Sequence, residues 1–220
     1  MLILGVVGPV GSGKSALLEE LRRCGAATIR ADDLSRELLH PGTELLAQVF
    51  AEFGSRFCRP DGTLDRAALG ELVFRDEEAR ERLERLTHPA MLAGLRERLA
   101  DFRAAGHQVA ALEAAVLDRM GARDLVDCAV LVTAPAEERI GRLVAAGLAP
   151  VEARRRVELH RALGLETPLC DYVLDNGGTV AALRAQAREL WGKVEAHAGG
   201  GTRSVARGRP LCYNRAGGER

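Results

Sequence analysis

The chain has 220 residues, of which 47% are hydrophobic and 28% charged, and its 31 basic residues balance 31 acidic ones. This length suits one α/β domain with inserted elements, and the composition is that of an ordinary globular protein. No apolar run approaches the roughly 18 residues of a membrane span. The even charge gives no general attraction to nucleic acid or to an anionic bilayer. We therefore expect a cytoplasmic protein that binds anions locally, with no membrane or nucleic-acid partner; the oligomeric state stays open.

Short apolar segments along the chain predict the buried strands of a parallel sheet. The first ends at a glycine-rich turn, and residues 15–24 follow it as a helix with Leu17, Leu18 and Leu21 on one face. Strands separated by helices favour right-handed parallel crossovers, so the predicted fold is α/β with a doubly wound, five-stranded parallel sheet. The predicted strands are residues 2–7, 26–30, 108–114, 128–133 and 171–175.

Two helix-patterned regions interrupt this sheet. Residues 34–104 are too long for a simple crossover, and they predict an inserted helical lobe with a turn at Pro60-Asp61-Gly62. Residues 137–165 are rich in Arg and Glu and predict two helices around a bend at Gly147 and Pro150. The core of the single domain is then residues 1–33, 105–136 and 166–195. Residues 196–220, which are rich in glycine and arginine without periodicity, predict a disordered tail.

The segment Gly8 to Ser15 fits the phosphate-binding pattern G-x-x-x-x-G-K-[ST] between the first strand and the first helix. Glycines let backbone N–H groups surround phosphate oxygens, and the helix N-terminus adds its positive dipole end. A glycine-rich helix cap is the simpler alternative, but Lys14 is one of only two lysines in the chain. We predict that Lys14 bridges the β- and γ-phosphates of a bound nucleotide and that Ser15 ligates Mg²⁺. The predicted nucleotide-binding residues are Gly8, Val10, Gly11, Ser12, Gly13, Lys14, Ser15 and Ala16.

The phosphate-binding loop alone does not name a reaction. The chain has no N-K-x-D motif for guanine and no L-S-G-G-Q transporter signature, and it carries a helical insertion after the second strand. These features favour a small-molecule kinase, which needs a carboxylate beside the acceptor hydroxyl. Asp32 and Asp33 follow the second strand at its carboxyl end, where ligands of such sheets bind. Either could be the general base, and a helix cap is the structural alternative.

At this point the sequence resembles the dephospho-CoA kinase family over about residues 3–192. The P-loop is similar to the family's G-G-I-G-S-G-K-S, and Arg30 to Arg36 resembles its D-A-D-x-x-x-R motif. Further matches lie in the helical region and at the end of the core. They are Asp61-Gly62-Thr63-Leu64-Asp65-Arg66, Val73-Phe74, Leu83-Glu84, His88-Pro89 and the run from Cys170 to Gly177.

The resemblance implies an ATP- and Mg²⁺-dependent kinase that phosphorylates the ribose 3′-hydroxyl of dephospho-CoA. Asp32 matches the family's catalytic base, and Arg36 and His88 match positions of the lobe that holds the acceptor. The resemblance also implies that residues 137–165 form a lid over ATP, in which Arg142 serves the phosphates as a catalytic residue. His88 could equally be a packed or capping histidine. Asp65 and Arg66 could equally be a local ion pair at a helix start.

Several positions depart from the family pattern. Arg30 replaces the first aspartate of D-A-D, and Ala115 to Arg119 replaces P-L-L-x-E. The lid pattern R-L-x-x-R-x-G is one residue shorter here, Ala146 stands at its second arginine, and His160 replaces a glutamine. A displaced lid arginine, such as Arg154 or Arg161 on one helix face, could compensate. The alternatives are a non-catalytic relative that binds ATP or a CoA-like ligand as a regulator, and a kinase with a different ribose-bearing acceptor.

Overall fold

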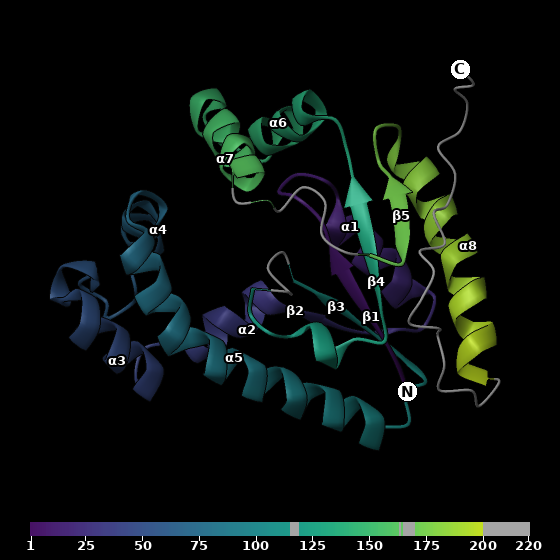
Figure 1. The fold of residues 1–220 in the computed structure, drawn as a ribbon, viewed down its shortest axis with the longest axis horizontal. Helices are drawn as coiled ribbons and strands as arrows, with labels where there is room; N and C mark the ends of the chain where they lie inside the picture. The colour runs from purple at the N-terminus through teal and green to yellow at the C-terminus, as the bar shows by residue number, and fades with distance from the viewer. Residues whose placement is uncertain (115–118, 163, 165–169, 200–220) are drawn as a thin grey trace. The chain divides into compact units, whose positions relative to one another are not determined.

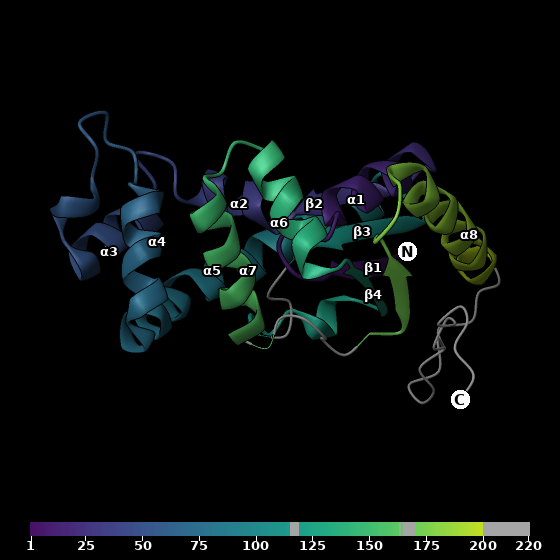
Figure 2. The ribbon, with the colours of Figure 1, turned by 90° about the horizontal axis from the view of Figure 1, so that it is seen from above.

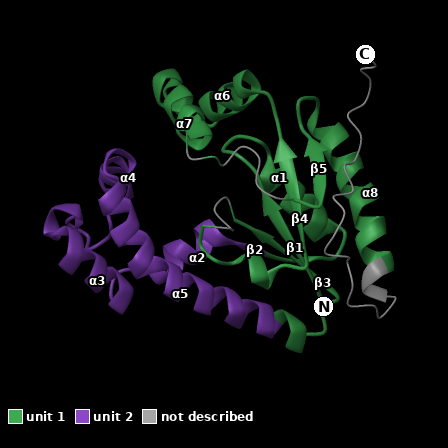
Figure 3. Ribbon diagram, in the orientation of Figure 1, with its two compact units in different colours: residues 1–28, 102–220 green, residues 29–101 purple. Residues whose placement is uncertain are grey.

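The computed structural model describes residues 1–114, 119–162, 164 and 170–199. The chain divides into two compact units, residues 1–28 with 102–220 and residues 29–101 (Figure 3). The second unit corresponds to the helical lobe predicted for residues 34–104. None of the described helices combines the length and hydrophobicity that a membrane span requires.

Five strands form the sheet, in the order β2-β3-β1-β4-β5. In the central strand, five of six residues are buried, because apolar residues follow one another without alternation. This strand pairs in parallel with both β3 and β4, and β4 pairs in parallel with β5. The predicted doubly wound α/β sheet is therefore confirmed. The strands are β1 Leu2–Val7, β2 Ala27–Arg30, β3 Val109–Glu113, β4 Cys128–Thr133 and β5 Tyr172–Asp175.

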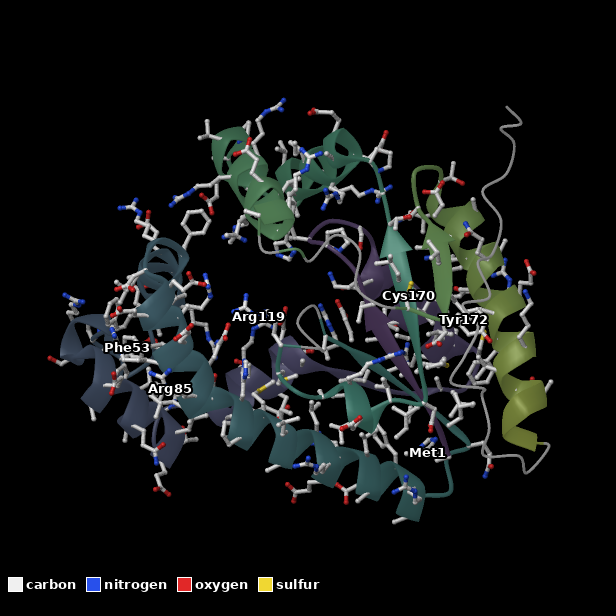
Figure 4. The ribbon with its side chains drawn as sticks, in the orientation of Figure 1. Met1, Phe53, Arg85, Arg119, Cys170 and Tyr172 are labelled. Atoms are coloured by element: carbon white, nitrogen blue, oxygen red, sulfur yellow. The ribbon has the colours of Figure 1, made fainter. Side chains whose placement is uncertain are left out.

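Helices α1 (Lys14–Arg23) and α8 (Val180–Gly199) pack against each other and against the sheet (Figures 1 and 2). They bury leucines such as Leu17, Leu21 and Leu183 completely. Tyr172, labelled in Figure 4, packs against the same core from β5. Helix α8 ends three residues beyond Ala196, where we predicted the tail to begin, so that boundary is corrected to Gly199. Residues 200–220 lie outside the described part of the chain.

Two further helices follow β4, as Figure 1 shows beyond the carboxyl end of that strand. They are α6 (Ala136–Ala145) and α7 (Pro150–Ala162), and they pack against each other. The chain bends between them at Gly147, whose φ of 96° is left-handed, and Pro150 begins α7 as predicted. A short 3₁₀ turn, η2 (Arg123–Leu125), precedes β4.

The helical lobe has its own hydrophobic core. Phe53, labelled in Figure 4, and Val49 bury their side chains there together with Leu46 and Leu69. The predicted turn at Pro60 to Gly62 is present, and Asp61 Oδ1 accepts hydrogen bonds from the backbone and the hydroxyl of Thr63. The elements are α2 Ala31–Leu38, α3 Glu44–Phe53, η1 Ser55–Phe57, α4 Arg66–Arg75 and α5 Glu77–Ala104.

Candidate active site

The P-loop has a conformation that only glycine permits at three positions. Gly8, Gly11 and Gly13 have φ values of 139°, 75° and 103°. A Cβ on Gly8 would lie 2.4 Å from the carbonyl oxygen of Val132, and one on Gly13 would lie 2.2 Å from Nδ2 of Asn176. The glycines are therefore required both for the backbone angles and for the close approach of β4 and of the segment after β5.

Several backbone carbonyl groups of the P-loop accept hydrogen bonds. Lys14 Nζ donates to the carbonyl of Pro9 at 3.1 Å, and the Ser12 N–H donates to the same carbonyl at 3.2 Å. Arg142 NH1 lies 3.3 Å from the Gly11 carbonyl oxygen and 3.4 Å from that of Ser12. These bonds hold the carbonyl groups of Pro9, Gly11 and Ser12 in place. Phosphate-binding loops bind anions through N–H groups on their other side.

Asn176 and Arg142 form a bonded pair beside this loop. Asn176 is 3% exposed, and its Nδ2 donates to the Ser12 carbonyl at 2.7 Å. Arg142 NH2 donates to the backbone carbonyl of Asn176 at 2.6 Å. The Asn176 N–H donates to Thr133 at 2.8 Å, so β4 fixes the asparagine in turn.

Ser15 and Glu113 bring oxygen atoms together at the start of α1. Ser15 Oγ lies 3.2 Å and 3.4 Å from the two carboxylate oxygens of Glu113, the last residue of β3. A hydroxyl and a carboxylate are ligands that suit Mg²⁺, which takes few protein ligands and completes its shell with phosphate and water oxygens. The two residues therefore fit the predicted metal position. Glu113 was not among the predicted site residues.

Helix α7 also reaches the P-loop. His160, near the end of α7, accepts a hydrogen bond at Nδ1 from the backbone N–H of Val10 at 3.3 Å. An acceptor at Nδ1 means that this nitrogen carries no proton. A glutamine, the residue that the resemblance leads us to expect here, could make the same bond with its side-chain oxygen.

In the helical lobe the two candidate bases have different surroundings. Asp33 forms ion pairs with Arg36 at 2.5 Å and with Arg30 at 3.8 Å. Asp32, the neighbouring residue in the first turn of α2, is exposed. The carboxylate of Asp33 is therefore engaged in ion pairs, and the assignment of the base to Asp32 stays a prediction. Arg30, which replaces a family aspartate, takes part in the charge arrangement of this helix start.

Asp65 and Arg66 do not form the local ion pair that we considered. Asp65 caps α4 by accepting the N–H groups of Ala67 and Ala68, and it pairs with Arg59 at 3.3 Å. The hydrogen bond from the Ala68 N–H, together with Arg59 and the Ala67 N–H, holds the pKa of Asp65 below its usual value.

Arg66 instead extends to α2, where its NH2 donates to the Ser35 carbonyl at 3.0 Å. Burial lowers the pKa of Arg66, the nearby charge of Arg36 lowers it further, and Asp32 opposes both effects. Asp32, Arg36 and Arg66 are therefore close enough to interact, and they form a charged corner of the lobe. His88 is half-buried in α5 of the same unit.

The predicted site residues thus fall into two groups. The P-loop and Arg142 lie in the unit that contains the sheet, and Asp32, Arg36 and His88 lie in the helical unit. Three contributors were missed: Glu113, Asn176 and Arg66. An acidic residue at the end of an apolar strand could have pointed to Glu113, whereas no local pattern marks the contacts of the other two. Residues 115–118 of the altered P-L-L-x-E motif lie outside the described residues.

Comparison with known proteins decides the family. The model of the family described as dephospho-CoA kinase matches residues 2–182. The chain belongs to the dephospho-CoA kinase family. Among curated relatives, the dephospho-CoA kinase of Geobacter sulfurreducens is 39% identical over 194 residues, which cover 88% of this chain and 98% of the relative. The dephospho-CoA kinase of Anaeromyxobacter dehalogenans is 36% identical over 214 residues, 97% of this chain and 100% of the relative.

Solved structures share the fold of this chain. The protein TT1252 from Thermus thermophilus is 31% identical and superposes with a TM-score of 0.69, over 87% of this chain and 97% of that chain. The dephospho-CoA kinase from Campylobacter jejuni has a TM-score of 0.64 at 21% identity, over 89% of this chain and 98% of that one. At that identity the second likeness concerns the fold, and it confirms the P-loop kinase architecture.

Proposed function

We propose that this dephospho-CoA kinase family member transfers the γ-phosphate of ATP to the ribose 3′-hydroxyl of dephospho-CoA, giving coenzyme A and ADP. The observation that carries the proposal is the family match over residues 2–182, which includes both the P-loop and the helical lobe. The P-loop supplies the nucleotide end of the reaction with Lys14 and Ser15 in place. The charged corner of the lobe supplies a carboxylate and two arginines for an anionic acceptor.

In this mechanism the chain's own residues position the reactants and move one proton. P-loop N–H groups and Lys14 hold the phosphates, and Asp32 accepts the proton of the attacking hydroxyl. Arg36 and Arg66 bind anionic groups of the acceptor, because paired guanidinium groups suit phosphate oxygens. His88 contacts the acceptor from α5. The helices α6 and α7 close over the nucleotide and exclude water, which limits hydrolysis of ATP.

Mg²⁺ would be held by Ser15 Oγ, with the Glu113 carboxylate beside it as a direct ligand or as an acceptor for its bound water. When bound, the ion neutralises charge on the β- and γ-phosphates. The fit rests on the 3.2 Å approach of these two oxygen groups. A regulator that binds ATP would also use the P-loop and this oxygen pair, so the feature that favours a kinase is the exposed carboxylate of Asp32 in the helical lobe.

The test is a coupled assay of ADP release with purified protein, ATP, Mg²⁺ and dephospho-CoA, with a control that lacks the acceptor. We expect acceptor-dependent turnover that Lys14→Ala abolishes. Asp32→Asn should lower turnover by about 10²- to 10⁴-fold, the usual contribution of a general base, and leave ATP binding intact. Asp33→Asn is the matched control and should retain turnover. ATP binding without turnover in the unmodified protein would favour the regulatory alternative, and full activity of Asp32→Asn would remove Asp32 as the base.

A further inference from the structure

The contacts of Arg142 differ from those that its predicted role on the transferring phosphate would require. Its guanidinium group donates to three backbone carbonyls, those of Gly11, Ser12 and Asn176, at 3.3, 3.4 and 2.6 Å. A guanidinium group has five N–H donors in a fixed planar arrangement, so it can hold several carbonyls in one geometry. In this structure those donors face the carbonyl side of the P-loop.

Asn176 holds the same part of the loop from another direction. Its Nδ2 and Arg142 NH1 share the Ser12 carbonyl as acceptor, and Arg142 NH2 binds the backbone of Asn176 itself. The arginine, the asparagine and the loop therefore form a closed set of hydrogen bonds. We define these two residues as the P-loop collar.

The planarity of the peptide bond gives the collar its effect. In a trans peptide the C=O and the following N–H point in opposite directions, so fixing the Ser12 oxygen also fixes the direction of the Gly13 N–H. Phosphate-binding loops act through such N–H groups. We propose that Arg142 and Asn176 are positioning residues that hold the P-loop peptides with their N–H groups directed at the β-phosphate.

Two buried oxygen atoms suggest that this arrangement serves function at some expense of stability. Ser12 Oγ and Asn176 Oδ1 are both buried, and neither has a hydrogen-bond partner among the described residues. Leaving such atoms unpaired is unfavourable for folding. The sequence nevertheless places a polar residue at Asn176 where its Nδ2 reaches the loop, and its close approach is what requires glycine at Gly13.

The inference rests on the proposed kinase activity for its kinetic readout only, because nucleotide binding tests it independently of the acceptor. A positioning residue acts on the loop that holds the β-phosphate, which ADP and ATP share. Arg142→Met and Asn176→Ala should therefore weaken Mg-ADP and Mg-ATP by the same factor, about tenfold or more. If Arg142 instead bound the γ-phosphate, its replacement would lower the affinity for ATP and the turnover number, and the affinity for ADP would stay unchanged.

Isothermal titration with both nucleotides would decide between these roles. The variants to be measured are Arg142→Met, Arg142→Lys, Asn176→Ala and the double variant that combines Arg142→Met with Asn176→Ala. The control is Arg22→Met, because the Arg22 guanidinium group pairs with Glu19 on the surface of α1. Arg142→Lys should not restore affinity, because a single ammonium group cannot hold three carbonyls. The loss of nucleotide affinity in the double variant should be smaller than the product of the two single losses, since both residues act on one loop. Arg22→Met should bind as the unmodified protein does.

Unchanged ADP affinity in Arg142→Met, or full recovery in Arg142→Lys, would overturn the inference. If Asn176→Ala does not fold, the comparison of Met and Lys at Arg142 still decides, because that side chain is only half-buried. A protein that binds ADP through the collar but shows no acceptor-dependent turnover would contradict the proposed function and leave the collar standing.

Discussion

Gly13→Ala tests the architecture of the P-loop most directly. At the φ of 103° observed for Gly13, an added Cβ lies 2.2 Å from Asn176 Nδ2. The left-handed backbone costs an alanine about 1–2 kcal/mol. Displacing Asn176 breaks its 2.7 Å bond to the Ser12 carbonyl and leaves buried polar groups unpaired, at a further cost of about 1–3 kcal/mol. The free energy of unfolding should therefore fall by about 2–5 kcal/mol, with nucleotide affinity falling as well.

Asn176→Ala separates the two contributions. Without the Asn176 side chain, the nearest remaining neighbour of the new Cβ is Leu183 Cδ2 at 3.6 Å, an ordinary contact. In that background Gly13→Ala should cost only the backbone part, about 1–2 kcal/mol. The assay is urea unfolding of the four proteins, with ADP affinity in parallel. Gly192→Ala is the control, because nothing lies within 4 Å of that position in α8. An equal cost in both backgrounds would refute the steric reasoning.

Three further changes probe the metal site, the lid and the core. Glu113→Gln should raise the Mg²⁺ concentration needed for half-maximal turnover without altering ADP binding in the absence of metal, and an unchanged Mg²⁺ dependence would remove Glu113 from the metal site. His160→Gln should keep the KM for ATP, whereas His160→Ala should raise it, because only glutamine still accepts a hydrogen bond from the P-loop N–H. Equal KM values in the two variants would count against this bond. Glu20→Ala removes a carboxylate that is 7% exposed and lies 2.6 Å from Arg188. The free energy of unfolding should fall by about 1–2 kcal/mol, measured in urea, because hydrogen bonds to charged groups are strong but the exposed arginine returns to water.

The sheet and the P-loop could be predicted because their signals are local. A continuous apolar run such as Leu2–Val7 specifies a buried strand, and the P-loop motif occupies eight consecutive residues. The end of α8 was harder to predict from the sequence. Glycine-rich composition predicted a tail from Ala196, but Val194 is 3% exposed and holds the preceding turn on the core, and alanine favours continuation of the helix to Gly199.

The contacts that organise the site could not be predicted in this way. Asn176 and Ser12 are 164 residues apart, and Glu113 and Ser15 are 98 residues apart, so each contact depends on the register of the strands that carry them. Arg142 stays a predicted site residue, and its contacts with the carbonyls of Gly11 and Ser12 follow from how α6 lies on the P-loop. The family resemblance suggested candidate site residues, but neither it nor the local sequence pattern indicated which atoms these residues bind.

The missing lid arginine can now be considered together with these contacts. Arg142 is occupied by the P-loop carbonyls. The two arginines of α7 with the closest carboxylates form ion pairs with lid residues, Arg154 with Glu137 at 3.2 Å and Arg156 with Glu152 at 2.9 Å. These arginines would have to break their ion pairs to reach a phosphate. We therefore expect the lid of this chain to stabilise the transferring phosphoryl group less than the family pattern would.

Ala146→Arg tests this expectation by placing a cation where the family carries one. Ala146 is the C-cap residue of α6 and is exposed, so the longer side chain meets no packing constraint from that helix. An arginine on the transferring phosphoryl group contributes roughly 10³-fold or more when well placed. Because the lid is one residue shorter here, a smaller gain in turnover number, about tenfold, is expected, with ADP affinity unchanged. Ala145→Arg is the matched control, since it adds the same charge about 100° around the helix. An unchanged turnover number in Ala146→Arg would mean that another cation already stabilises this charge, and the lid of this chain would then be rearranged rather than incomplete.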